Sequence, residues 1–171
     1  MKSWKQPRFF LSTFKALPHA AGNLERPYTL EDYRRIVRLN KEAGIDLIEN
    51  AIMSRAEGAL AAKACELEGV SYLVQNITGD MGYSGIGGQC FATVEGVEQI
   101  IREQKDSRYL EGYFVWDEMG EGDFPRCREI KDWFEARDPA RLAYSLVVPS
   151  YGAYWWEGEG VDNWQDSAFA R

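Results

Sequence analysis

The feature that most restricts the fold is a regular alternation of apolar runs with amphipathic segments along all 171 residues. Runs rich in β-branched and aromatic residues predict five strands, at 8–14, 45–50, 70–76, 112–118 and 141–150. Between the strands, a helical period of apolar residues predicts helices over 29–44, 54–69, 93–104 and 123–137. Strand and helix in strict succession indicate an α/β fold with a parallel sheet.

Residues at the predicted helix ends agree with these boundaries. Thr29 and Asp123 stand at N-cap positions, and Ser54 with Glu57 has the spacing of a capping box. Gly44 follows the first helix, where a left-handed backbone conformation commonly ends a helix. The helices are therefore predicted from two independent signals, their periodicity and their caps.

Two architectures fit this element order. A flavodoxin-like sheet, with strand order 2-1-3-4-5, would be complete at this length. A (β/α)8 barrel needs about 250 residues, so five strands in order 1-2-3-4-5 would be its first half. The final segment, "VDNWQDSAFAR", starts a helical pattern with no stop signal. We therefore interpret residues 1–171 as a single domain, a partial barrel truncated after strand five.

Composition excludes several classes of protein. The net charge of −7 argues against binding to nucleic acid. No apolar stretch is long enough to cross a bilayer, so no membrane partner is expected. Three cysteines and one histidine form no zinc pattern, and no metal or organic cofactor is implied. As written, the sequence favours the cytoplasm; a leader upstream would instead indicate a secreted or periplasmic protein.

Polar and aromatic residues gather where ligands bind in parallel α/β folds, at the carboxyl ends of the strands. Amides, carboxylates and aromatic rings together suit a polyhydroxylated ligand, because rings stack on sugar C–H surfaces while amides bond hydroxyls. Strand-end caps and loop packing are the alternative interpretation. The candidate ligand-binding residues are His19, Glu49, Asn50, Asn76, Trp116, Tyr151, Trp155 and Trp156.

Glu118 is the strongest catalytic candidate. The run "GYFVWDE" ends in Asp117 and Glu118, and strict alternation along the strand would place Trp116 and Glu118 on one side. A carboxyl group beside an indole lies in partly apolar surroundings, which favour the protonated form that a general acid needs. Both acids could instead interact with the N-terminus of the helix beginning near Asp123.

The chain resembles the first half of a (β/α)8-barrel glycoside hydrolase, in the broad β-galactosidase-like and cellulase-like group. The resemblance rests on "FFLSTF", "AGIDLIEN" and above all "GYFVWDE". It implies that the chain acts on a carbohydrate and that Glu118 is the acid/base glutamate of strand four, assisted by Asp117.

Two departures from the family pattern are clear. Asp117 stands where the family usually has asparagine, and strands six to eight, with the nucleophile of strand seven, are absent. We therefore expect the chain alone to be inactive, and its open sheet edges to favour self-association.

Three other functions fit parts of the pattern. One is a complete flavodoxin-like binding or signalling domain, and another is a non-catalytic carbohydrate-binding protein. The third is a metal-dependent sugar isomerase or epimerase using Glu49 and His19, although such enzymes usually need more than one histidine.

Overall fold

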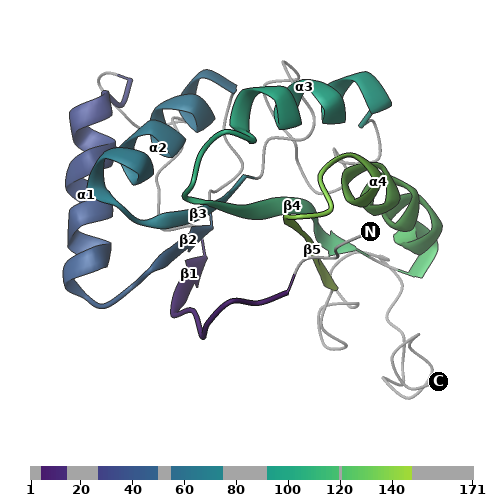
Figure 1. Cartoon of the computed structure of the whole chain (residues 1–171), viewed down its shortest axis with the longest axis horizontal. Helices are drawn as coiled ribbons and strands as arrows, with labels where there is room; N and C mark the ends of the chain where they lie inside the picture. Colours follow the sequence, from purple (N-terminus) through teal and green to yellow (C-terminus); the bar gives the residue numbers. More distant parts are fainter. Residues whose placement is uncertain (1–4, 15–26, 50–54, 75–91, 120, 148–171) are drawn as a thin grey trace, which may run out of the picture.

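The computed structural model describes residues 5–14, 27–49, 55–74, 92–119 and 121–147 (Figure 1). Five strands pair in parallel and in chain order, β1-β2-β3-β4-β5. The strands are β1 (Ser12–Phe14), β2 (Leu47–Glu49), β3 (Ser71–Val74), β4 (Leu110–Met119) and β5 (Leu142–Val147). The helices are α1 (Leu30–Glu42), α2 (Arg55–Glu68), α3 (Val94–Gln104) and α4 (Phe124–Arg137), with a short 3-10 turn η2 (Glu121–Asp123) before α4.

The sheet curls into a half barrel, and the helices alternate with the strands along its outer side (Figure 1). This order confirms the partial (β/α) barrel. The flavodoxin-like alternative is wrong, because it requires β1 to lie between β2 and β3.

The strand boundaries differ most at β1 and β4. β1 begins at Ser12 rather than at residue 8, because the Asp46 carboxylate accepts the Leu11 backbone N–H at 2.9 Å and pairs with Arg8. The Asp46 side chain thus takes the Leu11 backbone N–H, which is then not available for hydrogen bonding to a neighbouring strand. β4 begins two residues earlier than predicted, at Leu110.

Helix caps agree with the sequence at α1 and differ at α4. The Thr29 hydroxyl accepts the Asp32 amide at 3.3 Å, and the Asp32 carboxylate accepts the Thr29 amide at 2.8 Å, which completes a capping box. Gly44 has φ +85°, as the predicted stop requires. Asp123 occupies the N-cap position of α4 but makes no side-chain capping bond, because η2 leads into α4 with helical backbone angles at Asp123.

The main core lies between the sheet and the helices. Alternate strand residues point into it, among them Ile48, Tyr72 and Tyr113. The Tyr113 ring stacks on Phe134 of α4, with ring centroids 4.5 Å apart. Cys65 and Cys127 are buried and free, as expected of cysteines in amphipathic helices.

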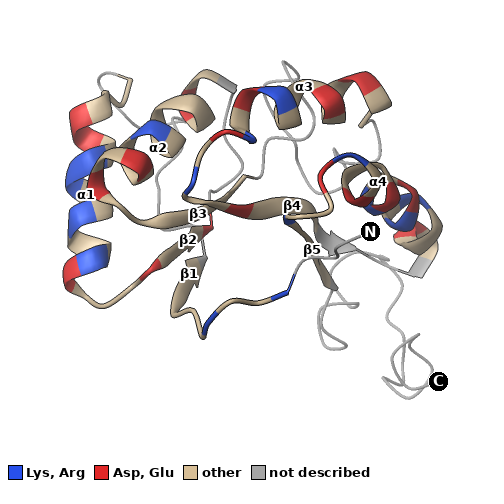
Figure 2. Cartoon of the chain, in the orientation of Figure 1, with Lys and Arg blue, Asp and Glu red and all other residues tan. Residues whose placement is uncertain are grey.

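Charged side chains lie along the exposed sides of the helices (Figure 2). Arg34 and Arg38 of α1 both donate to Glu68 of α2, at 2.7 and 3.1 Å. The Arg38 guanidinium also bonds Glu31, and this hydrogen bond lowers the pKa of the Glu31 carboxyl. These arginines of α1 therefore join α1 to α2.

Candidate functional site

The concave face of the sheet is the face turned away from the helices. Ile48, Tyr72 and Tyr113 belong to the helix-side core, whereas Leu73 and Phe114 are buried outside it. Since successive residues of a strand point to opposite faces, Leu73 and Phe114 lie on the concave side. In a barrel this is the interior, and the ligand binds at the carboxyl ends of its strands.

The strand register places one row of residues side by side across all five strands. The paired Cα positions are Phe14, Glu49, Leu73, Gly112 and Leu142, from β1 to β5. This row brings a carboxylic acid into a face that is otherwise mainly apolar at this level.

Glu49 is the predicted site residue that the structure describes best. Its neighbour Ile48 faces the helix-side core, so Glu49 points to the concave face, and only 6% of its surface is exposed. It is the last residue of β2, at the carboxyl end of that strand. Its side chain therefore lies on the concave side of the sheet, while its contact with a sugar remains a prediction.

Asp117 and Glu118 lie within β4, which continues to Met119. The structure describes their backbone but not the contacts of their side chains. Two register shifts against β5 occur on either side of Trp116, so Gly112 to Met119 spans seven steps while β5 advances by five. These bulges break the simple alternation from which the faces of both acids were predicted.

Trp116 shows the effect of the bulges directly. Strict alternation predicts that Trp116 shares a face with Phe114, but Trp116 packs in the helix-side core with Val115. The prediction of strict alternation is therefore wrong at this position, because the extra residue in β4 turns the chain. Trp116 is 1% exposed, and its Nε1 has no hydrogen-bond partner among the described residues.

The other candidate residues belong to the segments after the strand ends. They lie outside the described residues: His19, Asn50, Asn76, Tyr151, Trp155 and Trp156. Their proposed contacts stay predictions. Glu49, Asp117, Glu118 and Trp116 are thus the four candidates whose backbone position is known.

Sequence reasoning missed a buried polar network on the helix side of the sheet. The Tyr113 hydroxyl donates to Asp138 at 2.7 Å, and the Tyr72 hydroxyl to Gln104 at 3.0 Å. Burial raises the pKa of Tyr72 to about 12, and burial with the neighbouring Asp138 raises that of Tyr113 further. Gln104 and Asp138 precede β4 and β5 in the chain, so these hydrogen bonds lie toward the amino-terminal ends of the strands. The expected ligand binds at the opposite ends, and we therefore infer that these bonds stabilise the fold. No spacing in the sequence signals these pairs.

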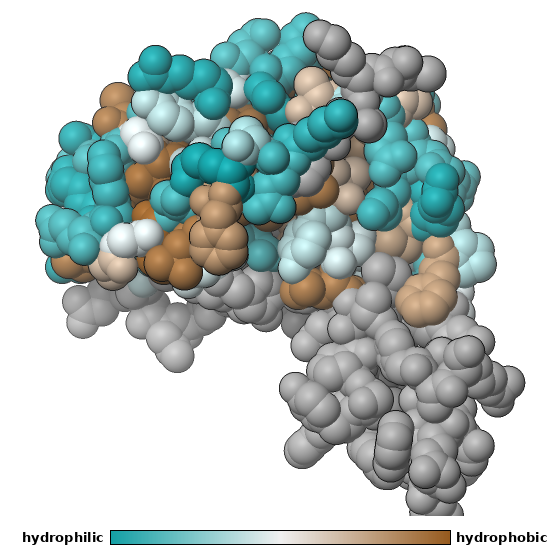
Figure 3. All heavy atoms as spheres, turned by 60° about the horizontal axis from the view of Figure 1, so that its bottom comes forward, coloured by the Kyte–Doolittle hydropathy of each residue, from teal (hydrophilic) through white to brown (hydrophobic). Residues whose placement is uncertain are grey.

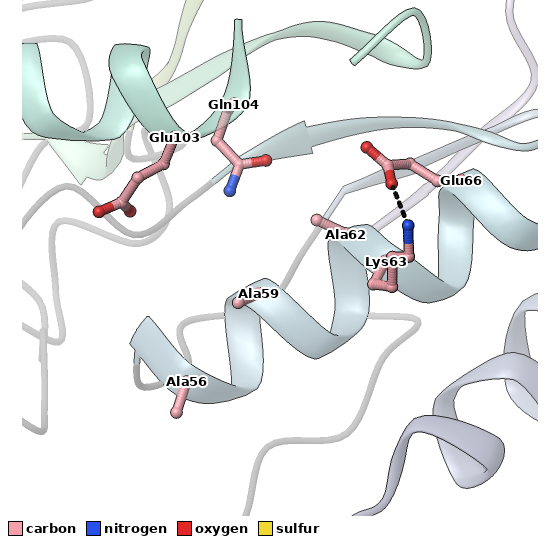
Figure 4. Close-up of a pocket in the computed structure, with 7 residues that line it drawn as sticks. All are labelled: Ala56, Ala59, Ala62, Lys63, Glu66, Glu103 and Gln104. Atoms are coloured by element: carbon pink, nitrogen blue, oxygen red, sulfur yellow. Dashed lines mark hydrogen bonds and ion pairs between the residues drawn. The ribbon is translucent and has the colours of Figure 1, made fainter. Parts of the chain in front are cut away.

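A pocket lies in the helix layer, between α2 and α3 (Figure 4). It has a volume of about 600 Å³ and is lined by small alanine side chains such as Ala59, and by Gln104 and the Lys63–Glu66 ion pair of 3.3 Å. Its helices are on the other side of the sheet from Glu49. We therefore keep it separate from the candidate site.

Two negative findings concern the part of the chain that the structure describes. It contains no group of three or more His, Cys, Asp or Glu side chains that could hold a metal ion. It also contains no helix of the length and hydrophobicity needed to span a membrane.

Comparisons with known proteins give the fold but no family. No protein-family model matches this chain, and no curated protein sequence matches it. Among solved structures, the β-glucuronidase of Parabacteroides merdae matches 78% of the chain at 14% identity, with a TM-score of 0.54. A GH2 β-galacturonidase from Eisenbergiella tayi bound to galacturonate matches 80% at 14% identity, also at 0.54.

A third structure, a β-glucuronidase from Ruminococcus gnavus in complex with an N1-substituted uronic isofagomine, matches 70% of the chain at 14% identity and a TM-score of 0.52. The chain spans only 17%, 24% and 21% of the lengths of these three proteins, in the order given. It therefore has a glycoside hydrolase-like fold and corresponds to a part of each of these enzymes.

Proposed function

We propose that this chain is a carbohydrate-binding unit of the (β/α)8 glycoside hydrolase type, with Glu118 as general acid/base and Asp117 assisting it. The observation that supports this most is the position of both acids in the last part of β4, in a half barrel that resembles parts of glycoside hydrolases. Asn50, Asn76, Tyr151 and Trp155 would hold the sugar, with His19 and Trp156 at its margins. Trp116 packs in the helix-side core, behind the face that would hold the ligand.

The proposed chemistry needs a second carboxyl group. A retaining glycosidase uses two carboxyls about 5–5.5 Å apart, and an inverting one places them about 6.5–9.5 Å apart. Asp117 directly precedes Glu118, so both acids approach the ligand from one strand. In the larger proteins of this fold, most of the chain lies outside the matched part. We therefore propose that the 171-residue chain binds sugar without hydrolysing it.

We expect Glu118→Gln to weaken binding of aryl glycosides to the purified chain by about fivefold to tenfold, since a charged hydrogen-bond acceptor becomes a neutral one. Isothermal titration against a panel of aryl glycosides measures the affinity, and release of the aryl group measures hydrolysis. Glu135→Gln is the matched control, because it makes the same change on the exposed surface of α4.

Two results would contradict the proposal. If no glycoside binds to the wild-type chain, the carbohydrate function is wrong. If the wild-type chain hydrolyses a glycoside and Glu118→Gln abolishes that activity, the need for a second carboxyl from elsewhere is wrong.

We also propose that two copies of the chain associate through the margins of the half barrel. Within the described residues, β1 and β5 each pair on one side only, which leaves backbone groups available. Beside β1, Phe9 and Leu11 are 83% and 49% exposed. Figure 3 shows apolar patches next to hydrophilic ones when the lower side of the molecule is turned forward.

Charge favours head-to-tail contact between copies. Residues 1–43 have nine basic and four acidic residues, a net charge of +5, whereas residues 44–171 have eleven and twenty-three, a net charge of −12. The β1 margin belongs to the positively charged part of one copy, and the β5 margin belongs to the negatively charged part of the other. Opposite net charges would thus face each other when the two margins meet. Two such contacts close a ring with twofold symmetry.

Light scattering after size-exclusion chromatography should give the mass of a dimer. We expect the double variant Phe9→Asp, Leu11→Asp to run as a monomer, because it puts two charges into the β1 margin. The control is Leu39→Asp, a comparably exposed leucine (56%) that belongs to α1 and not to the β1 margin. A monomeric wild-type chain, or a double variant that stays dimeric, rules out this interface.

A further inference from the structure

We propose that the Asp46 carboxylate clamps residues 8–11, so that Phe9 and Leu11 form a preformed contact surface for a second copy of the chain. This inference rests on the self-association proposed above and names the residue that prepares it. Asp46 is then a positioning residue, because it acts on the contact through the segment that it holds.

The clamped segment lies just outside the paired part of β1 and β2. Pairing of β1 with β2 begins at Ser12. On the β2 side, the chain just before Asp46 still belongs to the end of α1, since the Ile45 N–H donates to the Asn40 carbonyl at 2.9 Å. β2 therefore offers no regular strand residue opposite 8–10, and side-chain contacts have to fix this segment.

Asp46 supplies these contacts with both oxygens of one carboxylate. Its Oδ1 accepts the Leu11 N–H at 2.9 Å, and its Oδ2 pairs with the Arg8 guanidinium. The Asp46 backbone N–H also donates to the Leu11 carbonyl at 3.0 Å, and its carbonyl accepts the Ser71 N–H of β3 at 3.2 Å. The residue that holds both ends of the segment is thus itself fixed in the sheet.

The clamp also determines which side chains of the segment face solvent. The Arg8 guanidinium lies over the Phe10 ring, 4.4 Å from its centroid, and Phe10 is only partly exposed. Phe9 lies between these two residues and is 83% exposed, and Leu11 is 49% exposed. Two large apolar side chains therefore stand on the surface of a short segment whose ends are fixed.

A surface that is ordered beforehand favours association. Ordering a free segment opposes binding, because conformational entropy is lost when two copies meet, and a segment that is already held avoids most of that loss. The opposite net charges of residues 1–43 and 44–171 favour a second copy as the partner. Loss of the clamp should therefore weaken the dimer while Phe9 and Leu11 are still present.

The test compares two substitutions of Asp46. Asp46→Ala removes the acceptor of the Leu11 N–H and the partner of Arg8, whereas Asp46→Asn keeps an oxygen that can accept the Leu11 N–H. We expect Asp46→Ala to raise the dissociation constant of the dimer about tenfold or more, and Asp46→Asn to raise it about threefold. Sedimentation equilibrium measures that constant. Hydrogen exchange below that concentration should show the Leu11 amide exchanging about tenfold faster or more in Asp46→Ala.

Asp106→Ala is the matched control. It removes the same charge from an exposed turn between α3 and β4, and the dissociation constant should stay unchanged. Loss of a negative charge beside the β1 margin would by itself favour contact with the acidic part of another copy, so a weaker dimer in Asp46→Ala does not follow from net charge. Circular dichroism and thermal unfolding establish that each variant is folded.

The outcomes separate this inference from the proposed self-association. If the wild-type chain is a monomer, self-association is wrong and this inference fails with it. If the wild-type chain is a dimer and folded Asp46→Ala has the same dissociation constant, only the role of Asp46 is overturned. If the Leu11 amide exchanges at the wild-type rate in Asp46→Ala, the carboxylate does not hold the segment.

Discussion

Gly112→Ala is expected to destabilise the folded chain by about 3 kcal/mol or more, at the upper end of overpacking effects. A Cβ atom at Gly112 would lie 2.2 Å from the carbonyl oxygen of Leu142 and 2.7 Å from its Cβ. Both atoms belong to the first residue of β5, so neither is the end of a flexible side chain that can move aside. β4 and β5 would have to separate at the point where they first pair.

Chemical denaturation measures this loss as a change in the free energy of unfolding. The matched control is Gly122→Ala, because an added Cβ there meets no atom within 4 Å. We expect that control to change stability by about 0.5 kcal/mol or less. If the two variants are equally stable, the close approach of β4 and β5 at Gly112 is wrong.

The second large effect is a loss of stability above pH 10. Tyr33, Tyr72 and Tyr113 are 0%, 0% and 1% exposed, and burial is the largest cause that raises the pKa of each phenol. Tyrosine in an unfolded chain ionises near pH 10, whereas Tyr72 in the folded chain does so at about 12. Between these values the unfolded state loses protons that the folded state keeps, so rising pH favours unfolding.

The stabilisation by the neutral phenols is complete below pH 10 and is lost as the pH rises toward the folded-state values. Three such groups make the free energy of unfolding fall by about 4 kcal/mol per pH unit from about pH 10.5 to 12, since each contributes about 1.4 kcal/mol per unit. Urea denaturation at a series of pH values measures it. Buried Cys65, whose pKa burial raises to about 12, adds a slope of the same sign.

Tyr72→Phe tests the origin of that slope. The substitution removes one ionising group, so the pH dependence of the unfolding free energy should lose about one third of the tyrosine contribution. At neutral pH it should lower the free energy of unfolding by about 1 kcal/mol, because the hydrogen bond to Gln104 is lost. Tyr109→Phe is the control, because the ring of Tyr109 is only partly buried. An unchanged slope in Tyr72→Phe would assign the alkaline transition to other groups.

The sequence was sufficient for the order and type of the main elements. Periodicity gave all four helices to within one or two residues, and Thr29 and Gly44 marked both ends of α1 correctly. These signals are local, because a capping bond or a left-handed glycine involves residues at most a few positions apart. The strand order did not follow from these local signals, because a flavodoxin-like sheet has the same succession of elements. The partial barrel was inferred from the helical pattern at the end of the sequence, and the strand order β1-β2-β3-β4-β5 confirms it.

The side of the sheet that each strand residue faces could be predicted less accurately. In β2 all three residues are buried, so hydrophobicity does not tell the concave side from the helix side. In β4 the two bulges depend on the register against β5, which no pattern within 110–119 records, and Trp116 was therefore assigned to the wrong face. The same reason limits any prediction for Glu118, whose direction depends on the second bulge.

Strand order that equals chain order also has consequences for how the molecule forms. Each strand pairs only with the strands next to it in the chain, so every new unit docks on the one made just before, and each closure spans a single helix. The array behaves like a short repeat protein, whose stability is a sum over neighbouring units. β2, β3 and β4 each pair on both sides and should open after β1, which has three residues and one partner and should open first.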